Sequence, residues 1–342
     1  MSEVAPEPVV LAIMTAGSRP EIPPLDGVEL RFAEPDQTAE ALDGADALLV
    51  WNFNGTGLDA AWPRAGNLRW IHINSAGVDR IITPQIVDSK VVVTNARGVL
   101  NESIAEYVLA LILAFAKDLP KTLTLQQAHT WQHRPTQRLR GTRALVIGPG
   151  AIGRAIGALL GRLSIAVDAV GRTDRAGDDV FGRVFAPAAL PQVVGDYDFV
   201  VVAAPLTEAT RGMISAEVIA AMSPAACLIN VGRGPIVDEA ALSSAVQSRA
   251  IRGAGLDVFE NEPLEAASAL WTDANVIVSP HMAGDFFGWE DELLNVFLDN
   301  LDRYRHRKPL RNVVDPSLGF VPHDTDEPPT HTDAAQPTPG VS

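Results

Sequence analysis

Short apolar runs alternate with polar, helix-like segments along most of the chain. A strand followed by a helix, repeated, is typical of a parallel α/β sheet, because two neighbouring parallel strands need a crossover between them. The pattern therefore predicts a first parallel sheet near the N-terminus. Its strands are expected at residues 9–14, 28–33, 45–51, 68–73 and 90–96.

The clearest helix is expected at residues 101–119, where apolar side chains recur at helical spacing. Ser103, with Glu106 three residues later, matches a capping box, and Asn101 is an alternative cap. Pro120 is expected to end this helix.

A polar segment follows at residues 122–140 and carries Trp131. Little in it is apolar enough for a core, so we expect it to contact another protomer or the other half of the chain. His129 and His133 lie four positions apart, but no third ligand is near them in sequence. We therefore expect no metal site there.

The alternation of strands and helices restarts at Arg143 and predicts a second, doubly wound parallel sheet. A last amphipathic helix is expected at residues 289–307, before Pro309. Residues 321–342 are rich in Pro, Thr, Asp and His without an apolar period, and this composition predicts a disordered tail. After a first strand from Arg143, the further strands are expected at residues 164–170, 198–205, 226–232, 251–259 and 275–280.

Gly148, Gly150 and Gly153 stand in the spacing G-x-G-x-x-G, directly after the first of these strands. In such a turn the first glycine permits a tight bend and the second lets the backbone approach a pyrophosphate. The third lets the following helix, here starting at Ala151 and Ile152, pack close to the strand, with its N-terminus facing the negative charge. This position between a strand and a helix predicts a dinucleotide site. The alternative is a glycine-rich turn with a structural role only.

The next strand ends in Val170-Gly171-Arg172-Thr173, without the acid that usually binds the ribose hydroxyls of NAD. A guanidinium pairs with a 2′-phosphate, which a carboxylate would repel. We therefore predict NADP as the cofactor, bound near Arg172 and Thr173. The alternative is NAD, with Asp174 binding the ribose.

Three candidate catalytic residues follow successive strands of the second sheet: Arg233, Glu262 and His281. The carboxyl ends of such strands are where this fold binds its ligands. An arginine can bind the carboxylate of a 2-oxo acid and polarise its carbonyl, and a histidine can protonate the developing alkoxide. A carboxylate beside that histidine would stabilise the imidazolium. Each residue alone is more often structural, but together they predict a reductase site.

Composition narrows the class of protein. The 342 residues suggest two domains, and 47% hydrophobic with 20% charged residues suits a globular core. The net charge of −15, without a basic run, argues against nucleic acid or an anionic membrane as partner. The single cysteine, Cys227, lies in an apolar run, which predicts a buried thiol in a reduced, cytoplasmic protein. No signal peptide is visible, and the longest apolar run, 107–116, is too short to span a bilayer.

Seven motifs follow one another in order along residues 70–315: SAGVD, TNARGVLNESIAEYVLALIL, VIGPGAIGRAIG, APLTEATRGMI, LINVGRGPIVDEAAL, GAGLDVFENEPL and SPHMAG. In these motifs the chain resembles the D-isomer-specific 2-hydroxyacid dehydrogenases. The resemblance implies two Rossmann- or flavodoxin-like domains, with the nucleotide domain inserted into a discontinuous substrate domain. It implies a substrate domain at 1–100 and 288–320, a dinucleotide-binding domain at 101–287 and the tail at 321–342, in a homodimer.

The family's functional positions map onto individual residues of this chain. Arg233 matches the substrate-binding arginine, and Glu262 matches the acid paired with the general acid, His281. Ala76 and Gly77 match a turn whose amides bind the substrate carboxylate. The positions that match residues lining the cofactor are Pro205, Thr207, Val231, Gly232 and Asp257.

The expected function is reduction of a small 2-oxo acid to the D-2-hydroxy acid, with hydride from the cofactor and a proton from His281. Gly171-Arg172 is similar to the NADP-preferring glyoxylate and hydroxypyruvate reductases of the family. Three alternatives stay open: a dinucleotide-sensing corepressor or scaffold, an NAD-dependent phosphoglycerate-type dehydrogenase, and a formate- or phosphite-oxidising member.

Overall fold

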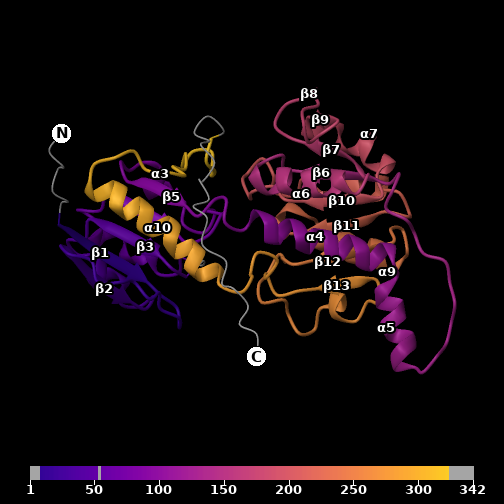
Figure 1. The fold of residues 1–342 in the computed structure, drawn as a ribbon, viewed down its shortest axis with the longest axis horizontal. Coiled ribbons are helices and arrows are strands. Elements are labelled where there is room, and N and C mark those ends of the chain that lie inside the picture. The colour runs from indigo at the N-terminus through magenta and orange to yellow at the C-terminus, as the bar shows by residue number, and fades with distance from the viewer. Residues whose placement is uncertain (1–7, 53–54, 323–342) are drawn as a thin grey trace, which may run out of the picture.

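The structure, a computed structural model, describes residues 8–52 and 55–322. Two sheets lie in two lobes of the molecule (Figure 1). The first sheet has five strands, all parallel, in the order β2-β1-β3-β4-β5. This is the flavodoxin-like order. Its strands are β1 (Val9–Met14), β2 (Val28–Ala33), β3 (Ala47–Val50), β4 (Trp70–Ile73) and β5 (Val92–Asn95).

The second sheet has eight strands in the order β13-β12-β11-β10-β6-β7-β9-β8. The six strands from β12 to β9 in this order have the doubly wound arrangement of dinucleotide-binding folds. Among the eight strands of the sheet, only β8 and β9 pair antiparallel. The predicted α/β fold with two parallel sheets is confirmed. The strands are β6 (Arg143–Ile147), β7 (Ala166–Val170), β8 (Arg175–Ala176), β9 (Arg183–Phe185), β10 (Phe199–Val202), β11 (Cys227–Asn230), β12 (Gly253–Leu256) and β13 (Val276–Val278).

Helices cover both faces of the second sheet. One core lies under α4 (Asn101–Ala116) and α6 (Ala151–Arg162). The opposite core lies under three shorter helices, α7 (Leu190–Val193), α8 (Ala216–Ala221) and α9 (Glu239–Gln247).

The C-terminal helix α10 (Trp289–Arg305) returns to the first sheet and crosses its strands (Figure 1). Leu294, Phe297 and Leu301 of α10 pack in one core with β1, β3 and Trp70. The chain therefore leaves the first lobe, builds the second and comes back. Short helices of the first lobe are α1 (Thr38–Leu42), α2 (Leu58–Ala61) and α3 (Pro84–Val87). 3-10 turns lie at Trp62–Arg64, Pro187–Ala189, Val194–Asp196, Gly234–Ile236 and Ala269–Trp271.

The expected helix at 101–119 is two helices. α4 ends at Ala116, and Asp118 takes a left-handed backbone (φ 53°) before α5 (Leu119–Gln127) begins. Pro120 stands in the first turn of α5, where a missing N–H costs nothing, so the prediction that it ends the helix is wrong. The capping box is also wrong, because α4 has no side-chain cap and Ser103 donates instead to the carbonyl of Ala283.

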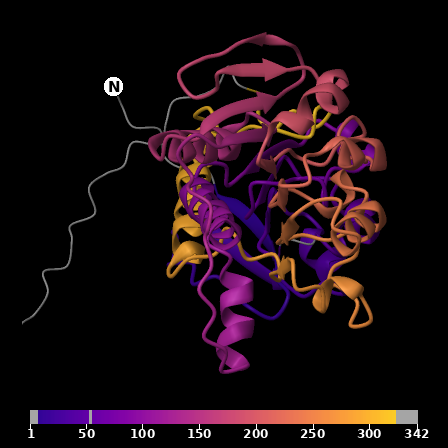
Figure 2. The same ribbon diagram turned by 90° about the vertical axis from the view of Figure 1, so that its right-hand side faces the viewer.

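α5 projects from the second lobe, away from the cores of both sheets (Figure 2). It leaves Leu119 and Leu123 exposed, and Trp131 in the following segment is fully exposed. Val321, at the start of the expected tail, is buried in the core of the first sheet, and residues 323–342 of that tail lie outside the described residues. In the part of the chain that the structure describes, no helix combines the length and apolar character needed to cross a bilayer.

Candidate active site

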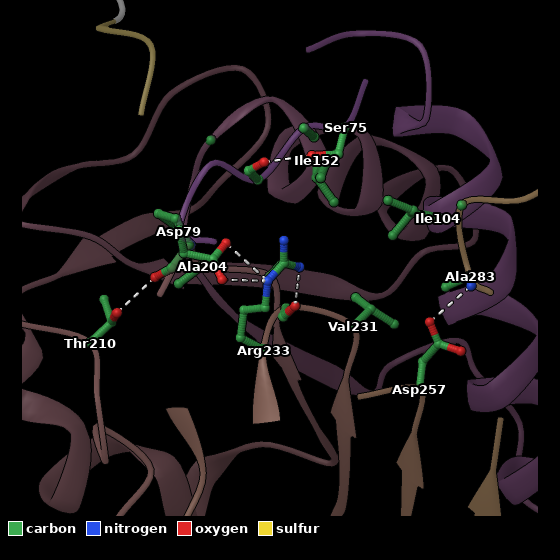
Figure 3. A pocket seen from close by; sticks show the side chains of 18 of the residues that line it. Ser75, Asp79, Ile104, Ile152, Ala204, Thr210, Val231, Arg233, Asp257 and Ala283 are labelled. Carbon is green, nitrogen blue, oxygen red and sulfur yellow. Dashed lines mark hydrogen bonds and ion pairs between the residues drawn. The ribbon is translucent and has the colours of Figure 1, made fainter. Parts of the chain in front are cut away.

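A cleft of about 1460 Å³ lies between the two sheets. Its walls come from both lobes, with Ser75 and Asp79 from the first and Arg233 and Asp257 from the second (Figure 3). The loops that follow β4, β6, β7, β10, β11, β12 and β13 line it, all of them at the carboxyl ends of their strands. This is where the alternation of strands and helices places a ligand.

The glycine turn between β6 and α6 is shaped by close backbone contacts. Gly148 has φ 100°, and a Cβ there would lie 2.7 Å from the Cα of Ala204. A Cβ on Gly153 would lie 2.0 Å from the carbonyl oxygen of Gly148. Gly150, the N-cap of α6, has nothing within 4 Å of its Cβ position. The middle glycine therefore faces open space, which fits the role expected for a backbone that must approach a pyrophosphate.

This difference predicts that alanine at position 153 lowers the stability of the fold, whereas alanine at position 150 weakens cofactor binding. Gly153→Ala should destabilise the fold by about 1–3 kcal/mol, because the new methyl group meets backbone that cannot yield. Gly150→Ala should cost about 1 kcal/mol or less, since φ is −77° and the site is open. It should nevertheless weaken NADPH binding about tenfold or more. Thermal unfolding and a fluorescence titration with NADPH separate the two, and unchanged binding by Gly150→Ala would contradict this placement of the pyrophosphate.

At the end of β7, Gly171 fits closely against Pro149, whose Cγ would lie 3.0 Å from an added Cβ. Arg172 lines the cleft beside it, and no described carboxylate pairs with its guanidinium. Asp174, the alternative ribose ligand, instead accepts hydrogen bonds from Arg183 at 3.1 and 3.3 Å. At the end of β7 the cleft is therefore lined by the cationic Arg172 and not by Asp174. Thr173 is exposed and does not line the cleft.

Arg233 lies at the centre of the cleft, where its orientation is fixed by two partners (Figure 3). Its Nε donates to both carboxylate oxygens of Asp79, at 3.1 and 3.2 Å, and its Nη1 donates to the carbonyl of Gly232 at 2.8 Å. Nη2 has no acceptor among the described residues and points toward Gly77, where an added Cβ would lie 2.0 Å from it. One end of the guanidinium is therefore held by the protein while the other faces the substrate side.

The turn after β4 is held from two sides. The side-chain amide of Asn95, the last residue of β5, donates a hydrogen bond to the carbonyl of Ala76 at 2.6 Å. The hydroxyl of Ser75 donates to the carbonyl of Gly77 at 2.5 Å. With these carbonyls bound by side chains, Ala76 and Gly77 form a fixed wall of the cleft beside Arg233.

His281 and Glu262 are in contact. The Nδ1 of His281 lies 2.9 Å from Oε2 of Glu262, and Arg80 from the other lobe donates to the same oxygen at 2.9 Å. Burial opposes ionisation of Glu262, but the hydrogen bond and charge of His281, the backbone N–H of Phe259 and the Arg80 guanidinium together lower its pKa to about 2. The carboxylate is therefore charged at neutral pH. It holds Nδ1 of the imidazole and leaves Nε2 for chemistry.

Asp257 anchors the loop that carries His281. It is buried, and its carboxylate accepts hydrogen bonds from the Ser279 hydroxyl at 2.6 Å and from the amides of Met282 and Ala283 at 2.9 and 2.8 Å. Its own carbonyl accepts from the His281 amide at 2.8 Å. His281 keeps a left-handed backbone (φ 55°) within this loop.

The structure brings almost all the predicted site residues to this cleft. Gly153 is buried behind the turn, as its packing role requires, and Thr173 stands apart. The sequence reasoning missed Asp79, Arg80 and Asn95, which orient the predicted residues. The predicted residues that line the cleft are Ala76, Gly77, Gly148, Gly150, Ala151, Ile152, Arg172, Pro205, Thr207, Val231, Gly232, Arg233, Asp257, Glu262 and His281.

Comparison with known proteins agrees with this geometry. The family model of the D-isomer specific 2-hydroxyacid dehydrogenase NAD-binding domain matches residues 109–283. A glyoxylate/hydroxypyruvate reductase B from Shigella boydii serotype 4 is 31% identical over 83% of this chain and 88% of that protein.

Solved structures of similar proteins cover nearly the whole chain. One is a D-isomer specific 2-hydroxyacid dehydrogenase from Xanthobacter autotrophicus Py2 in complex with NADPH and MES, with a TM-score of 0.78 and 30% identity over 91% of this chain and 99% of that one. Another is an NADPH-dependent glyoxylate/hydroxypyruvate reductase from Sinorhizobium meliloti in complex with NADP and sulfate, with a TM-score of 0.77 and 26% identity over the same shares. The alternatives of a corepressor and of a phosphoglycerate-type enzyme are not favoured by these similarities.

Proposed function

The chain belongs to the D-isomer specific 2-hydroxyacid dehydrogenases, and on that premise we propose that it is a glyoxylate/hydroxypyruvate-type reductase that works in the cleft described above. It is an oxidoreductase that uses a nicotinamide dinucleotide to reduce small 2-oxo acids. The observation that carries the assignment is that one cleft contains both Arg233, held in a fixed orientation, and the hydrogen-bonded pair of His281 and Glu262.

In this proposal the substrate carboxylate binds beside the contact between Gly77 and Arg233, where it accepts hydrogen bonds from Nη2 of Arg233 and from the backbone amides of the Ala76–Gly77 turn. The guanidinium also polarises the 2-oxo group, which increases the positive charge on C2. The bound nicotinamide supplies the hydride. His281 donates the proton from Nε2 to the developing alkoxide, and the Glu262 carboxylate stabilises the imidazolium before that transfer.

The substrate assignment is tested by a panel of 2-oxo acids. Glyoxylate, hydroxypyruvate, pyruvate and phenylpyruvate would be assayed at saturating NADPH and, in parallel, NADH. We expect the highest kcat/KM with glyoxylate or hydroxypyruvate. A clear preference for phenylpyruvate would contradict the small-substrate proposal, and no turnover with any of the four would contradict the function as a whole.

We further propose NADP as the preferred cofactor, with Arg172 binding its 2′-phosphate. Arg172→Ala should lower kcat/KM for NADPH about 10- to 100-fold and leave that for NADH nearly unchanged, because only NADPH carries the phosphate. Arg175→Ala is a matched control three positions further along the chain, in β8, since Arg175 already pairs with Asp178. A wild-type protein that prefers NADH, with no change in Arg172→Ala, would overturn this assignment.

The domain division proposed is residues 1–100 with 288–320 and residues 101–287, supported by the packing of α10 on the first sheet. Limited proteolysis should yield a stable fragment close to 101–287, and scattered cuts within it would contradict the division.

For a place of action we propose a reducing compartment such as the cytoplasm. Cys227 is buried, and burial raises the pKa of its thiol to about 12. Cell fractionation tests that location.

A homodimer is proposed because α5 projects from the second lobe (Figure 2). Its Leu119 and Leu123 are exposed, and Trp131, which follows it, is fully exposed. Sedimentation equilibrium should give twice the chain mass of 36.4 kDa. Replacement of Trp131 and Leu123 by polar residues should shift the protein toward the monomer. A wild-type monomer at micromolar concentration would contradict the proposal.

A further inference from the structure

The chain after α10 forms a loop that reaches from the first lobe to the cofactor end of the cleft. The amide of Val314 donates to the carbonyl of Val93 at 2.8 Å, and the side-chain amide of Asn312 donates to the carbonyls of Asn95 and Arg97. Val314 and Val321 are both buried in the core of the first sheet. Residues 315–320, here called the C-terminal loop, are thus fixed at both ends.

The C-terminal loop is also closed internally. The amide of Asp315 donates to the carbonyl of Phe320 at 3.1 Å, and the amide of Gly319 donates to the carbonyl of Asp315 at 2.9 Å. The Asp315 carboxylate accepts from the hydroxyl and amide of Ser317 at 2.6 and 2.9 Å. These hydrogen bonds hold the loop in one shape, so its tip can place a side chain accurately.

The tip lies against two loops of the second sheet. The Arg172 guanidinium lies over the ring of Phe320, 5.3 Å from its centre. A Cβ on Gly319 would lie 3.7 Å from Cγ2 of Thr207. Arg172 follows β7 and Thr207 follows β10, and both line the cleft together with Phe320. The first lobe therefore supplies a side chain to the wall of the cofactor site.

The contact between Phe320 and Arg172 matters because no described carboxylate neutralises the charge of Arg172. Neighbouring arginines are neutralised by acids: Arg154 pairs with Asp178 and Asp179, and Arg183 pairs with Asp174. Arg172 has no such partner among the described residues, and the aromatic ring is the group that faces its guanidinium. An aromatic face attracts a cation without neutralising it, so the charge stays available to an anion.

We propose that Phe320 is a positioning residue for cofactor choice: its ring holds the Arg172 guanidinium where it binds the 2′-phosphate of NADP. The inference rests on the proposed function, in which NADP is the cofactor. It makes the preference for NADP a property of both lobes. The C-terminal loop contributes the ring and the second sheet contributes the charge.

The test replaces the ring while keeping its bulk. Phe320→Leu removes the aromatic face, and Phe320→Tyr retains it. Dissociation constants for NADPH and NADH would be measured by fluorescence titration, with kcat at saturating cofactor as a second readout. We expect Phe320→Leu to weaken NADPH about three- to tenfold, with NADH and kcat nearly unchanged, and Phe320→Tyr to bind both like the wild type. Phe287→Leu makes the same change at a fully exposed ring that does not line the cleft; it is the control and should leave both constants unchanged.

A double substitution shows whether Phe320 acts through Arg172. In an Arg172→Ala background, Phe320→Leu should cause no further loss of NADPH affinity. Equal weakening of NADPH and NADH would overturn the inference, because it would mean that the ring supports a part common to both cofactors. An unchanged NADPH constant in Phe320→Leu would overturn it as well. Failure of the wild-type protein to prefer NADPH would contradict the cofactor proposal itself, before any variant is compared.

Discussion

Replacing His281 by alanine is expected to lower kcat by about two to four orders of magnitude, the usual contribution of a positioned general acid. The geometry gives the reason. Glu262, kept ionised by a pKa lowered to about 2, holds Nδ1 of His281 at 2.9 Å and leaves Nε2 to donate. Alanine removes the proton donor but does not touch the glycine turn that binds the cofactor. NADPH affinity should therefore stay close to that of the wild type.

The measurement is kcat with a saturating 2-oxo acid, beside an NADPH titration. Phe287→Ala is a suitable control, since Phe287 lies six positions further along the chain, is fully exposed and does not line the cleft. It should keep normal kcat. A near-normal kcat in His281→Ala would remove this residue from the mechanism. A loss of NADPH binding in the same variant would show that the loop, rather than the acid, had been damaged.

Arg233→Ala is expected to raise KM for the 2-oxo acid and to lower kcat, with kcat/KM reduced about 10² to 10³-fold. The residue has two effects, since it binds the carboxylate and polarises the carbonyl. Both depend on the orientation that Asp79 and the Gly232 carbonyl give it. Because alanine removes donors that contact substrate rather than cofactor, KM for NADPH should change little.

Arg233→Lys is the informative control for that substitution. Lysine keeps the charge but lacks the planar fork that contacts Asp79 and the substrate at the same time. We expect partial recovery of kcat/KM, with KM recovering more than kcat. Kinetics in Arg233→Ala that match the wild type would exclude the assigned role. An effect limited to KM for NADPH would place Arg233 in the cofactor site instead.

Most of the fold could be predicted because strand and helix signals are local. The apolar runs located every strand of the first sheet to within a few residues. The predicted helix at 101–119 was wrong at its end, since the break depends on the backbone of Asp118 and on Pro120 starting a helix. The β8–β9 hairpin was missed because its strands have two and three residues and show no apolar pattern.

The candidate site shows the same division. Arg233, Glu262 and His281 could be predicted because each lies in the loop that follows a strand, and the strand ends meet at one edge of the sheet. Their partners could not. Asp79 and Arg233 are 154 positions apart, and Arg80 and Glu262 are 182 apart. No local pattern links such pairs; only the approach of the two lobes brings them together. Phe320 lies beside Arg172 for the same reason.

The central claim, that this cleft transfers a hydride from the cofactor to C2 of a small 2-oxo acid, is tested most directly with labelled cofactor. NADPH carrying deuterium at both C4 positions would be incubated with hydroxypyruvate and the full-length protein, and the product examined by mass spectrometry and chiral chromatography. We predict D-glycerate with one deuterium at C2, and almost none formed by His281→Ala over the same time. Unlabelled product, the L-enantiomer or no reduction would contradict the account.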